Sequence, residues 1–346
     1  MDNDPKHPAL LWEPTGDKEV SCGLCNFRCR IKPGKRGHCQ VRENYDGKLY
    51  SLNYSAVCSV SVDPIEKKPL FHFYPGSRSL SYAAPGCNFR CEFCQNWQIS
   101  QQVRLWKKID GQAYSSQQLV QAGLDGGCAS VAHTYTEPTI YFELAYETAK
   151  LAHKKGLTNV FVSNGYMTIE AIEMIKPYLD GINVDLKSFR DEFYRQRTGA
   201  RLEPVLETLR HIAKQPDIWL EITTLIIPQA NDSDEELGEL AKFINDELGP
   251  QVPWHVSRFH PQYKFSDTEP TPSSTLQRAF DIAKAAGLKY VYIGNLRMQN
   301  AENTCCPKCK ELLIEREEFC VTRNKIINSQ CPDCGEKIAG FNISSR

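Results

Sequence analysis

Residues 80–100 read LSYAAPGCNFRCEFCQNWQIS, in which a short apolar run leads directly into three closely spaced cysteines. The run at 80–84 predicts a β-strand. Three residues separate Cys87 from Cys91, and two separate Cys91 from Cys94. Three thiolates this close in one loop can bind one face of a [4Fe-4S] cubane and leave its fourth iron without a protein ligand.

An open iron of this kind permits chemistry, because the amino and carboxylate groups of S-adenosylmethionine (SAM) can chelate it. Electron transfer to the bound SAM would then break a sulfur–carbon bond and form a 5′-deoxyadenosyl radical. A zinc knuckle is the alternative interpretation of the same cysteines. Zinc prefers four ligands in paired Cys-x2-Cys units, and the nearest histidine, His72, lies across a predicted strand. We therefore expect the cluster.

The middle of the chain alternates short apolar runs with amphipathic helical patterns. The runs predicted to be strands are 80–84, 129–135, 159–164, 181–186, 219–227, 254–259 and 290–295. The helical patterns include 115–127, 138–156 and 232–249. Near-continuous apolar strands that alternate with helices are typical of parallel βα units. The sequence therefore predicts an α/β fold, as a full or partial parallel β/α (TIM-like) barrel.

Polar residues follow several of these predicted strands. Glu137 follows the second, Asn164 the third, and Asp185 and Lys187 the fourth, while His255 lies within the sixth. In parallel barrels the active site lies at the carboxyl ends of the strands. Together with the cysteine loop after the first strand, these residues predict one shared cavity. For Asn164 a turn-forming role before glycine is the alternative.

The two flanks differ from the middle in composition. Residues 1–71 are rich in Cys, Gly, Pro and basic residues, and residues 299–346 are short and Cys-rich with turn signals. We predict three parts: a metal-binding N-terminal cap at 1–71, the barrel core at 72–298, and a zinc-ribbon- or rubredoxin-like knuckle at 299–346.

The N-terminal cysteines supply enough ligands to close a metal site. Their spacing is two, three and nine residues, in the order Cys22, Cys25, Cys29 and Cys39. Tetrahedral zinc and a second, all-cysteine iron–sulfur cluster are both allowed. The spacing is unlike paired zinc knuckles and therefore favours iron. A second cluster would relay electrons, whereas zinc would only hold the cap together.

The tail cysteines follow a zinc-ribbon pattern. Its ligands are Cys306, Cys309, Cys331 and Cys334, with Cys305 as an alternative first ligand. In so short a segment the metal would contribute most of the folding free energy. Glutamates offset the basic residues of the tail, and no basic stripe with interleaved aromatics occurs, which argues against nucleic-acid binding.

Charge and hydropathy narrow the class of protein further. The 41 basic and 42 acidic residues leave a formal net charge of −1, which gives no support to binding driven by bulk charge. No run of 18 apolar residues occurs, and the first residues lack the pattern of a signal peptide. We expect a cytosolic (cytoplasmic) protein without membrane association, whose cysteines are reduced.

These motifs together resemble a known family. The core resembles the activating enzymes of glycyl radical enzymes, and roughly residues 20 to 340 resemble the radical SAM member of the AmmeMemoRadiSam system. The segments that carry the resemblance are 22–44, 62–100, YTEPTI (135–140), SNGY (163–166), NVDLK (183–187), GNL (294–296) and the CPKC…CPDCG tail (306–335).

The resemblance implies roles for residues outside the cysteines. Asp185 and Lys187 would contact the amino-acid end of SAM, where a carboxylate suits the ammonium and a lysine suits the carboxylate. Glu137 would contact the ammonium, Phe93 would pack near the adenine, and His255 would lie near the ribose. Without the resemblance, a surface ion pair and a core histidine are the simpler interpretations of Asp185–Lys187 and His255.

Two departures from the family pattern affect the substrate. The family's Gly-Gly-Glu-Pro is here Tyr135-Thr136-Glu137-Pro138, so the glycines that let backbone approach the ligand are absent. Thr223 stands about where glycyl radical activases have an arginine. Substrate handling is therefore expected to differ from that of true activases.

The sequence thus predicts a radical SAM enzyme that abstracts hydrogen from an unidentified substrate, which could be a protein. A glycyl radical enzyme activase is the alternative among enzymes, and a non-catalytic zinc-binding interaction protein is the alternative of another class. The predicted cofactors are a [4Fe-4S] cluster and SAM, with a possible second cluster and zinc. The predicted partners are a reductant such as flavodoxin or ferredoxin and, by resemblance, Ammecr- and Memo-type proteins.

Overall fold

The computed structural model describes residues 7–298 and 300–345. Contacts divide the chain into two compact units. The first comprises the described residues up to 62, with 79–180 and 198–200; the second comprises 63–78, 181–197 and the rest from 201. The N-terminal region thus belongs to one unit and the tail to the other. The division at 71 and 298 stays a prediction, and residues 1–6, 299 and 346 of its parts lie outside the described residues.

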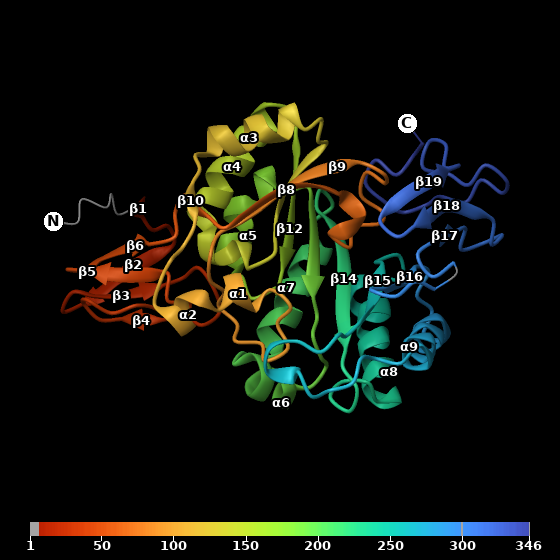
Figure 1. Cartoon of the computed structure of the whole chain (residues 1–346). Helices are drawn as coiled ribbons and strands as arrows, with labels where there is room; N and C mark the ends of the chain where they lie inside the picture. The colour runs from red at the N-terminus through yellow and green to blue at the C-terminus, as the bar shows by residue number, and fades with distance from the viewer. Residues whose placement is uncertain (1–6, 299, 346) are drawn as a thin grey trace. The chain divides into compact units, whose positions relative to one another are not determined.

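The first unit contains parallel strands with helices between them. β9 (Arg78–Ala83), β11 (Ser130–His133) and β12 (Thr158–Ser163) pair in parallel, with Ala132 opposite Ser81 and Val160, and β8 (Ser59–Pro64) lies beside β9. Helices α3 (Ser116–Asp125) and α4 (Phe142–Lys154) pack on each other and on β11 (Figure 1). The strands and helices predicted in this region are confirmed.

Local sequence signals explain where these helices begin and end. Ser115 forms a capping box with Gln118, in which each side chain bonds the other's backbone N–H. Leu119, Val120 and Gly123 form the buried face of α3. The helix ends at Asp125, with Gly126 as its C-cap, and Gly127 follows with a φ of +60°.

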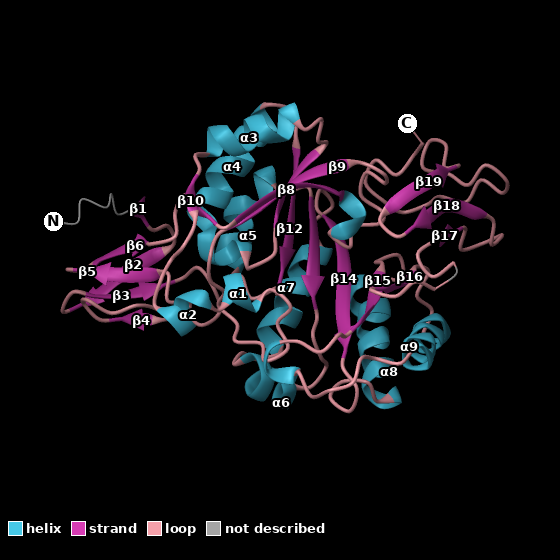
Figure 2. Ribbon diagram, viewed as in Figure 1, coloured by secondary structure: helices cyan, strands magenta, loops and turns pink. Residues whose placement is uncertain are grey.

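The N-terminal part of the first unit is built from short antiparallel strands, and Figure 2 shows no helix among the described residues 7–58. One sheet has the order β1-β6-β5 and another the order β2-β3-β4. Their bounds are β1 His7–Pro8, β2 Trp12–Gly16, β3 Glu19–Cys22, β4 Arg30–Ile31, β5 Arg42–Tyr45 and β6 Lys48–Ser51. The remaining elements of this unit are β7 Ala56–Val57, α1 Trp97–Ser100, α2 Gln102–Trp106, β10 Gln112–Ala113, η2 Pro138–Tyr141, α5 Ile169–Ile175 and η3 Lys176–Tyr178.

The second unit repeats the pattern of parallel strands and helices. β13 (Gly181–Asp185), β14 (Trp219–Ile226), β15 (Trp254–Arg258) and β16 (Val291–Gly294) pair in parallel in this order. Ser233 caps α8 through the N–H of Glu236. The helices are η1 Ile65–Lys67, α6 Asp191–Phe193, η4 Tyr194–Thr198, α7 Glu203–Ala213, α8 Asp234–Phe243, η5 Ile244–Leu248, η6 Tyr263–Phe265 and α9 Ser273–Ala285. All four predicted strands are confirmed.

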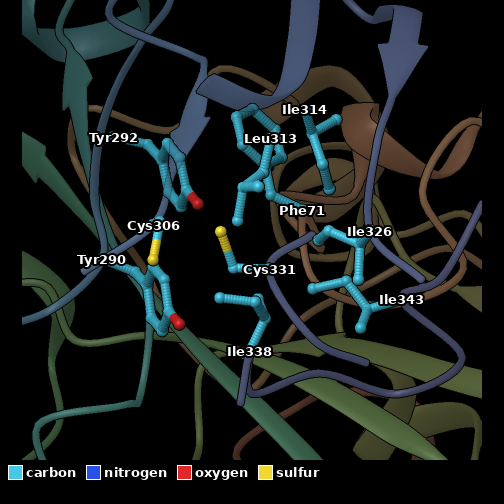
Figure 3. Packing of buried hydrophobic residues seen from close by; sticks show 10 residues of the cluster. All are labelled: Phe71, Tyr290, Tyr292, Cys306, Leu313, Ile314, Ile326, Cys331, Ile338 and Ile343. Carbon is cyan, nitrogen blue, oxygen red and sulfur yellow. The ribbon is translucent and has the colours of Figure 1, made fainter. Parts of the chain in front are cut away.

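The tail belongs to this second unit and forms a three-stranded antiparallel sheet. Its strands are β17 (Thr304–Cys305), β18 (Leu312–Glu317) and β19 (Cys320–Asn324). Figure 3 shows its apolar side chains packed around Tyr290 and Tyr292 of the β16 region. Burial of such a cluster is the main favourable contribution to folding. No helix within residues 7–298 and 300–345 is long and apolar enough to cross a membrane.

Candidate functional site

The cysteine loop follows β9 directly. Cys87 and Cys91 are buried and Cys94 is partly exposed. The backbone N–H of Phe89 donates to the Sγ of Cys87 at 3.3 Å, and the Sγ of Cys94 lies 3.2 Å from the Oγ of Ser100 at the end of α1. The loop therefore folds back on its own thiols and keeps them at its inner side.

The electrostatics of this loop fit a bound cluster. Burial raises the pKa of the Cys87 thiol well above its usual value, and the charges of Glu137, Cys91 and Cys94 raise it further. Crowded, buried thiols resist deprotonation unless a cation compensates their charge. The Nδ2 of Asn88 is buried and has no hydrogen-bond partner among the described residues. Three thiols and a spare donor suit an iron–sulfur cluster, whose sulfurs accept hydrogen bonds.

Asn164 connects the end of β12 to this loop. Its Nδ2 donates to the Oδ1 of Asn88 at 2.7 Å and lies 3.8 Å from the Sγ of Cys87. Its Oδ1 accepts from the N–H of Tyr166 at 3.1 Å, which closes a turn around Gly165 at a φ of +70°. Asn164 therefore forms a turn and also reaches the cysteine loop.

Glu137 lies at the carboxyl end of β11 and is completely buried. Its carboxylate accepts hydrogen bonds from the N–H and Oγ1 of Thr139, the Oγ of Ser163 and the N–H of Asn164, at 2.5–3.1 Å. Burial raises the pKa of Glu137, and these donors oppose the rise. Glu137 thus joins the ends of β11 and β12 below the turn that holds Asn164.

Two further residues of this unit bear on the expectations from the sequence. Tyr135 has a φ of +65°, the left-handed conformation that glycine adopts most easily, at a position where the family pattern has glycine. Tyr135 therefore has a backbone conformation that is uncommon for a residue with a side chain. Phe93, in the cysteine loop, is 3% exposed and forms part of the core.

Asp185 and Lys187 form an ion pair in the second unit. Asp185 is the last residue of β13, and its Oδ2 lies 3.0 Å from the Nζ of Lys187. The backbone of Lys187 is held on both sides, because its N–H bonds the hydroxyl of Tyr194 and its carbonyl accepts from Asn231. The pair thus presents opposite charges side by side at the carboxyl end of a parallel strand.

His255 lies on β15 in a buried network that the sequence did not reveal. Its Nε2 is 2.6 Å from the Oε2 of Glu221, and its ring packs against Phe71 and Tyr292. Glu221 is fully buried and also accepts from the N–H groups of Phe71 and His72. Burial would raise the pKa of Glu221, but the hydrogen bond and charge of His255 hold it below its usual value. A carboxylate inside the apolar run WLEITTLII was the available signal.

The register of the strands aligns several of these side chains. Thr223 of β14 lies opposite Asp185 on one side and His255 on the other. Residues opposite each other in adjacent strands point to the same face of a sheet. The hydroxyl of Thr223 is buried and has no hydrogen-bond partner among the described residues. Asp185, Thr223 and His255 therefore share one face of this unit.

The four tail cysteines form a compact group of sulfurs. The Sγ atoms of Cys306 and Cys334 lie 3.6 Å apart, as do those of Cys309 and Cys331, and all four lie within 4.8 Å of one another. A tetrahedron of thiolates about 2.3 Å from one zinc ion has edges of about 3.8 Å. Figure 3 shows Cys306 and Cys331 within the apolar cluster. Cys305 is exposed and outside the group.

The N-terminal cysteines lie on neighbouring segments, since the N–H of Cys22 donates to the carbonyl of Cys29 at 2.9 Å. Burial raises the pKa of the Cys25 thiol well above its usual value, and Cys22, Cys39 and Cys29 raise it further. Two donors face this group: the Nη1 of Arg42 lies 3.5 Å from the Sγ of Cys22, and the N–H of His38 lies 3.4 Å from the Sγ of Cys29. The group and the central loop belong to the same unit.

The structure therefore brings together some of the expected residues within each unit. In the first, Asn164 contacts the loop of Cys87, Cys91 and Cys94, and Glu137 binds the N–H of Asn164. In the second, Asp185 pairs with Lys187 and shares a face with His255. Glu221, Asn88 and Ser163 were missed, because an isolated polar residue in a sequence does not reveal which partner it meets.

Comparison with known proteins gives a family and several relatives. Residues 82–244 match the Radical SAM superfamily. An uncharacterized protein of Methanocaldococcus jannaschii is 45% identical over 335 residues, which cover 95% of this chain and 98% of the relative. The 4-hydroxyphenylacetate decarboxylase activating enzyme of Clostridium scatologenes is 25% identical over 231 residues, or 65% of this chain and 64% of that enzyme.

A solved structure shares the fold. SuiB of Streptococcus suis, bound to S-adenosylmethionine, matches with a TM-score of 0.51 at 15% sequence identity, covering 68% of this chain and 54% of SuiB. At this identity the likeness concerns the α/β fold alone.

Proposed function

Because this chain belongs to the radical SAM superfamily, we propose that Cys87, Cys91 and Cys94 bind a [4Fe-4S] cluster at which SAM is cleaved. With both groups bound, reductive cleavage of SAM supplies a 5′-deoxyadenosyl radical that abstracts a hydrogen atom from the substrate. The observation that carries the proposal is the loop after β9, in which Cys87, Cys91 and Cys94 fall within eight residues, Cys87 and Cys91 are buried, and the Nδ2 of Asn164 lies 3.8 Å from the Sγ of Cys87.

The surroundings of the loop support this role. The N–H of Phe89 donates to the Sγ of Cys87, and the buried Nδ2 of Asn88 is available as a further donor. Hydrogen bonds to cluster sulfurs and burial both tune the reduction potential. Asn164 fixes Asn88, and Glu137 fixes the turn of Asn164. These residues therefore set the electronics of the loop without binding the metal themselves.

Two charged residues are proposed to bind the amino-acid end of SAM. Asp185 would accept the ammonium and Lys187 would donate to the carboxylate, since each group already faces its opposite charge. When SAM replaces the Asp185–Lys187 ion pair with one contact to each residue, every charge still has a partner.

The remaining contacts of SAM are proposals from the resemblance. Glu137 is assigned to the methionyl ammonium, Phe93 to the adenine and His255 to the ribose, and Asn164 is proposed as a further polar contact to SAM. Protein donors already surround Glu137, and Glu221 already bonds His255. Glu137 and His255 are therefore proposed to act first by positioning their neighbours. Thr223, with its buried hydroxyl, is available to a ligand on the same face.

The wider assignment extends to architecture, partners and compartment. We propose that the parallel strands form a full or partial β/α barrel, flanked by a metal-binding cap (1–71) and a zinc knuckle (299–346). The substrate is unidentified, and a protein substrate is the working proposal. The proposed electron donor is a flavodoxin or ferredoxin, the proposed partners are Ammecr- and Memo-type proteins, and the proposed compartment is the cytoplasm.

A glycyl radical enzyme activase is the second candidate function. It is favoured by the relative that is named as an activating enzyme. Thr223, which stands where activases have arginine, counts against it. The missing glycines at Tyr135 and Thr136 also count against it, because side chains stand where the family pattern has none. Detection of a glycyl radical on a partner protein, measured in place of a small-molecule product, would distinguish this candidate.

A zinc-binding interaction protein without catalysis is the alternative of another class. The sulfur spacing of the tail supports zinc there. Zinc binding in the central loop would require a fourth ligand beside Cys87, Cys91 and Cys94. The two functions therefore differ in which metal the central loop holds.

Metal analysis after anaerobic reconstitution with iron and sulfide tests the proposal. The full-length protein is compared with a variant in which Cys87, Cys91 and Cys94 are all changed to alanine. Cys320→Ser, at an exposed cysteine outside the three groups, is the matched control. We expect the triple variant alone to lose about four iron and four sulfide atoms per chain. Equal iron in all three proteins would contradict the proposal.

A further inference from the structure

The loops of the N-terminal cysteines touch the loops of the candidate site. The N–H of Asn26, next to Cys25, donates to the carbonyl of Tyr166 at 3.0 Å, and the Nδ2 of Asn26 donates to the carbonyl of Met167 at 2.8 Å. Tyr166 is in the SNGY turn, two residues after Asn164. The N-terminal cysteine group therefore lies against the turn that contacts the cysteine loop.

One arginine joins the two cysteine loops directly. The Nη2 of Arg104 donates to the carbonyl of His38, next to Cys39, at 2.7 Å. Its Nη1 donates to the carbonyls of Cys87 and Phe89, each at 3.0 Å. The planar guanidinium of arginine donates in fixed directions, so it holds both loops at a set separation. Arg104 thus connects the two cysteine loops through one side chain.

Aromatic rings form a second connection between the same loops. The ring of Phe27 stacks on that of His38, with centroids 3.9 Å apart. Phe27 also contacts Tyr166 at 4.9 Å, and Tyr166 contacts Phe89 at 5.2 Å. Phe89 lies between Cys87 and Cys91. Packed rings therefore extend without a gap from beside Cys39 to the central loop.

The outer side of the N-terminal group is basic. Cys29 is the one partly exposed thiol of this group, and the other three are buried. Beside it, the exposed loop carries Arg30, Lys32 and Lys35. A basic patch next to a partly exposed metal site suits an acidic carrier protein, because complementary charge speeds association.

From these contacts we infer that Cys22, Cys25, Cys29 and Cys39 hold an iron–sulfur cluster that relays single electrons to the central loop. The inference rests on the proposed function, because the relay needs an electron acceptor at Cys87, Cys91 and Cys94. The cysteine spacing of two, three and nine residues is unlike paired zinc knuckles. Zinc also has no redox chemistry, so it would make no use of the connections through Arg104 and Phe27.

The proposed step transfers one electron and changes no covalent bond. The N-terminal site is oxidised by one electron and the central site is reduced by one. An acidic one-electron carrier of the flavodoxin or ferredoxin class then reduces the N-terminal site again. Each SAM cleaved in this way consumes one electron from the carrier.

The first test measures metals and paramagnetic clusters in the full-length protein after anaerobic reconstitution. We expect about eight iron atoms per chain, and two reduced clusters by electron paramagnetic resonance after dithionite. SAM should change the signal of only one of them. In the variant with Cys87, Cys91 and Cys94 changed to alanine, about half of the iron and the SAM-insensitive signal should remain, without SAM cleavage.

The outcomes separate this inference from the proposed function. If the wild-type protein shows one cluster and the triple variant holds only zinc, the N-terminal cluster is refuted while the central assignment stands. If the wild-type protein holds two clusters but forms no 5′-deoxyadenosine, the proposed function is refuted instead. The wild-type spectrum decides the first question even if the triple variant does not fold.

A second test addresses the relay. Arg104→Lys keeps the positive charge but removes the planar guanidinium that spans both loops. With reduced flavodoxin as the donor, we expect the central cluster to be reduced at least tenfold more slowly in this variant than in the Cys320→Ser control. The Cys25→Ser variant should show the same loss together with half of the iron. Reduction at the wild-type rate in Cys25→Ser would overturn the relay.

Discussion

The side-chain nitrogen of Asn164 donates a 2.7 Å hydrogen bond to the side-chain oxygen of Asn88, next to Cys87 in the cysteine loop. Both residues are buried, so the bond is shielded from water. It joins the turn after β12 to the loop after β9, and the Nδ2 of Asn88 is buried without a hydrogen-bond partner among the described residues.

Loss of this bond should impair the site more than the fold. Asn164→Ala removes the closer of two donors to the buried Oδ1 of Asn88 and leaves only the thiol of Cys87 at 3.7 Å, and loss of a buried hydrogen bond costs about 1–3 kcal/mol. We expect a roughly tenfold lower rate of SAM cleavage with iron content retained. The rate and the iron content are measured together, with Asn245→Ala on the π-helix η5 as the control. Unchanged cleavage would show that this bond does not position the loop.

Glu137 is expected to matter chiefly for stability. Glu137→Ala removes the acceptor of four hydrogen bonds and leaves donors of Ser163, Thr139 and Asn164 buried without partners. The free energy of unfolding should fall by about 3–5 kcal/mol. Urea denaturation measures this loss, and Glu207→Ala on the exposed side of α7 should change it little. A loss below about 1 kcal/mol would be inconsistent with the network.

The burial of His72 predicts that the stability of the second unit depends on pH. Its Nδ1 lies 2.6 Å from the carbonyl of Ala339 and its Nε2 lies 2.5 Å from the hydroxyl of Tyr292. Burial lowers the pKa of His72 from 6.5 to about 4. Between these values the unfolded chain binds the proton and the folded chain does not, so stability falls as the pH falls from 6.5 to 4. The full effect is about 3 kcal/mol.

Denaturation midpoints at several pH values check this expectation. His72→Gln keeps a polar side chain but cannot titrate, so its stability should depend less on pH in this window. The difference between the wild-type and variant curves is the quantity to compare. Parallel curves would mean that other groups cause the acid sensitivity.

The tail cysteines should affect stability rather than catalysis. Cys334→Ala breaks a sulfur group whose other members include the buried Cys306 and Cys331. We expect loss of the bound zinc and a melting temperature lower by roughly 5–10 °C, since metal binding contributes folding free energy. Cleavage of SAM per folded molecule should persist. Cys320→Ser, exposed on β19, should retain both the zinc and the melting temperature.

The parts of the fold with strong periodicity could be predicted from the sequence. Runs such as 159–164 and 219–227 became β12 and β14 because buried parallel strands are apolar on both faces. The short strands before residue 60 were not predicted. Pieces of two to five residues among Gly, Pro and Cys turns have no periodicity to detect.

The polar networks could not be predicted from the sequence, for another reason. His255 was singled out, but its partner Glu221 is 34 positions away and was not. Arg316 donates to the carbonyl of Phe71 from 245 positions away and stacks on its ring. Such pairs depend on tertiary packing, and one sequence holds no record of which residues meet. Cysteine groups were easier, because metal ligands recur at short spacings.

The assay of 5′-deoxyadenosine tests the central claim most directly. Reconstituted protein is incubated anaerobically with dithionite and SAM, beside Cys91→Ala and Cys334→Ala. The account predicts 5′-deoxyadenosine from the wild-type protein and from Cys334→Ala, and none from Cys91→Ala. Equal formation by the Cys91 variant, or none by a wild-type protein that holds its iron, would contradict it.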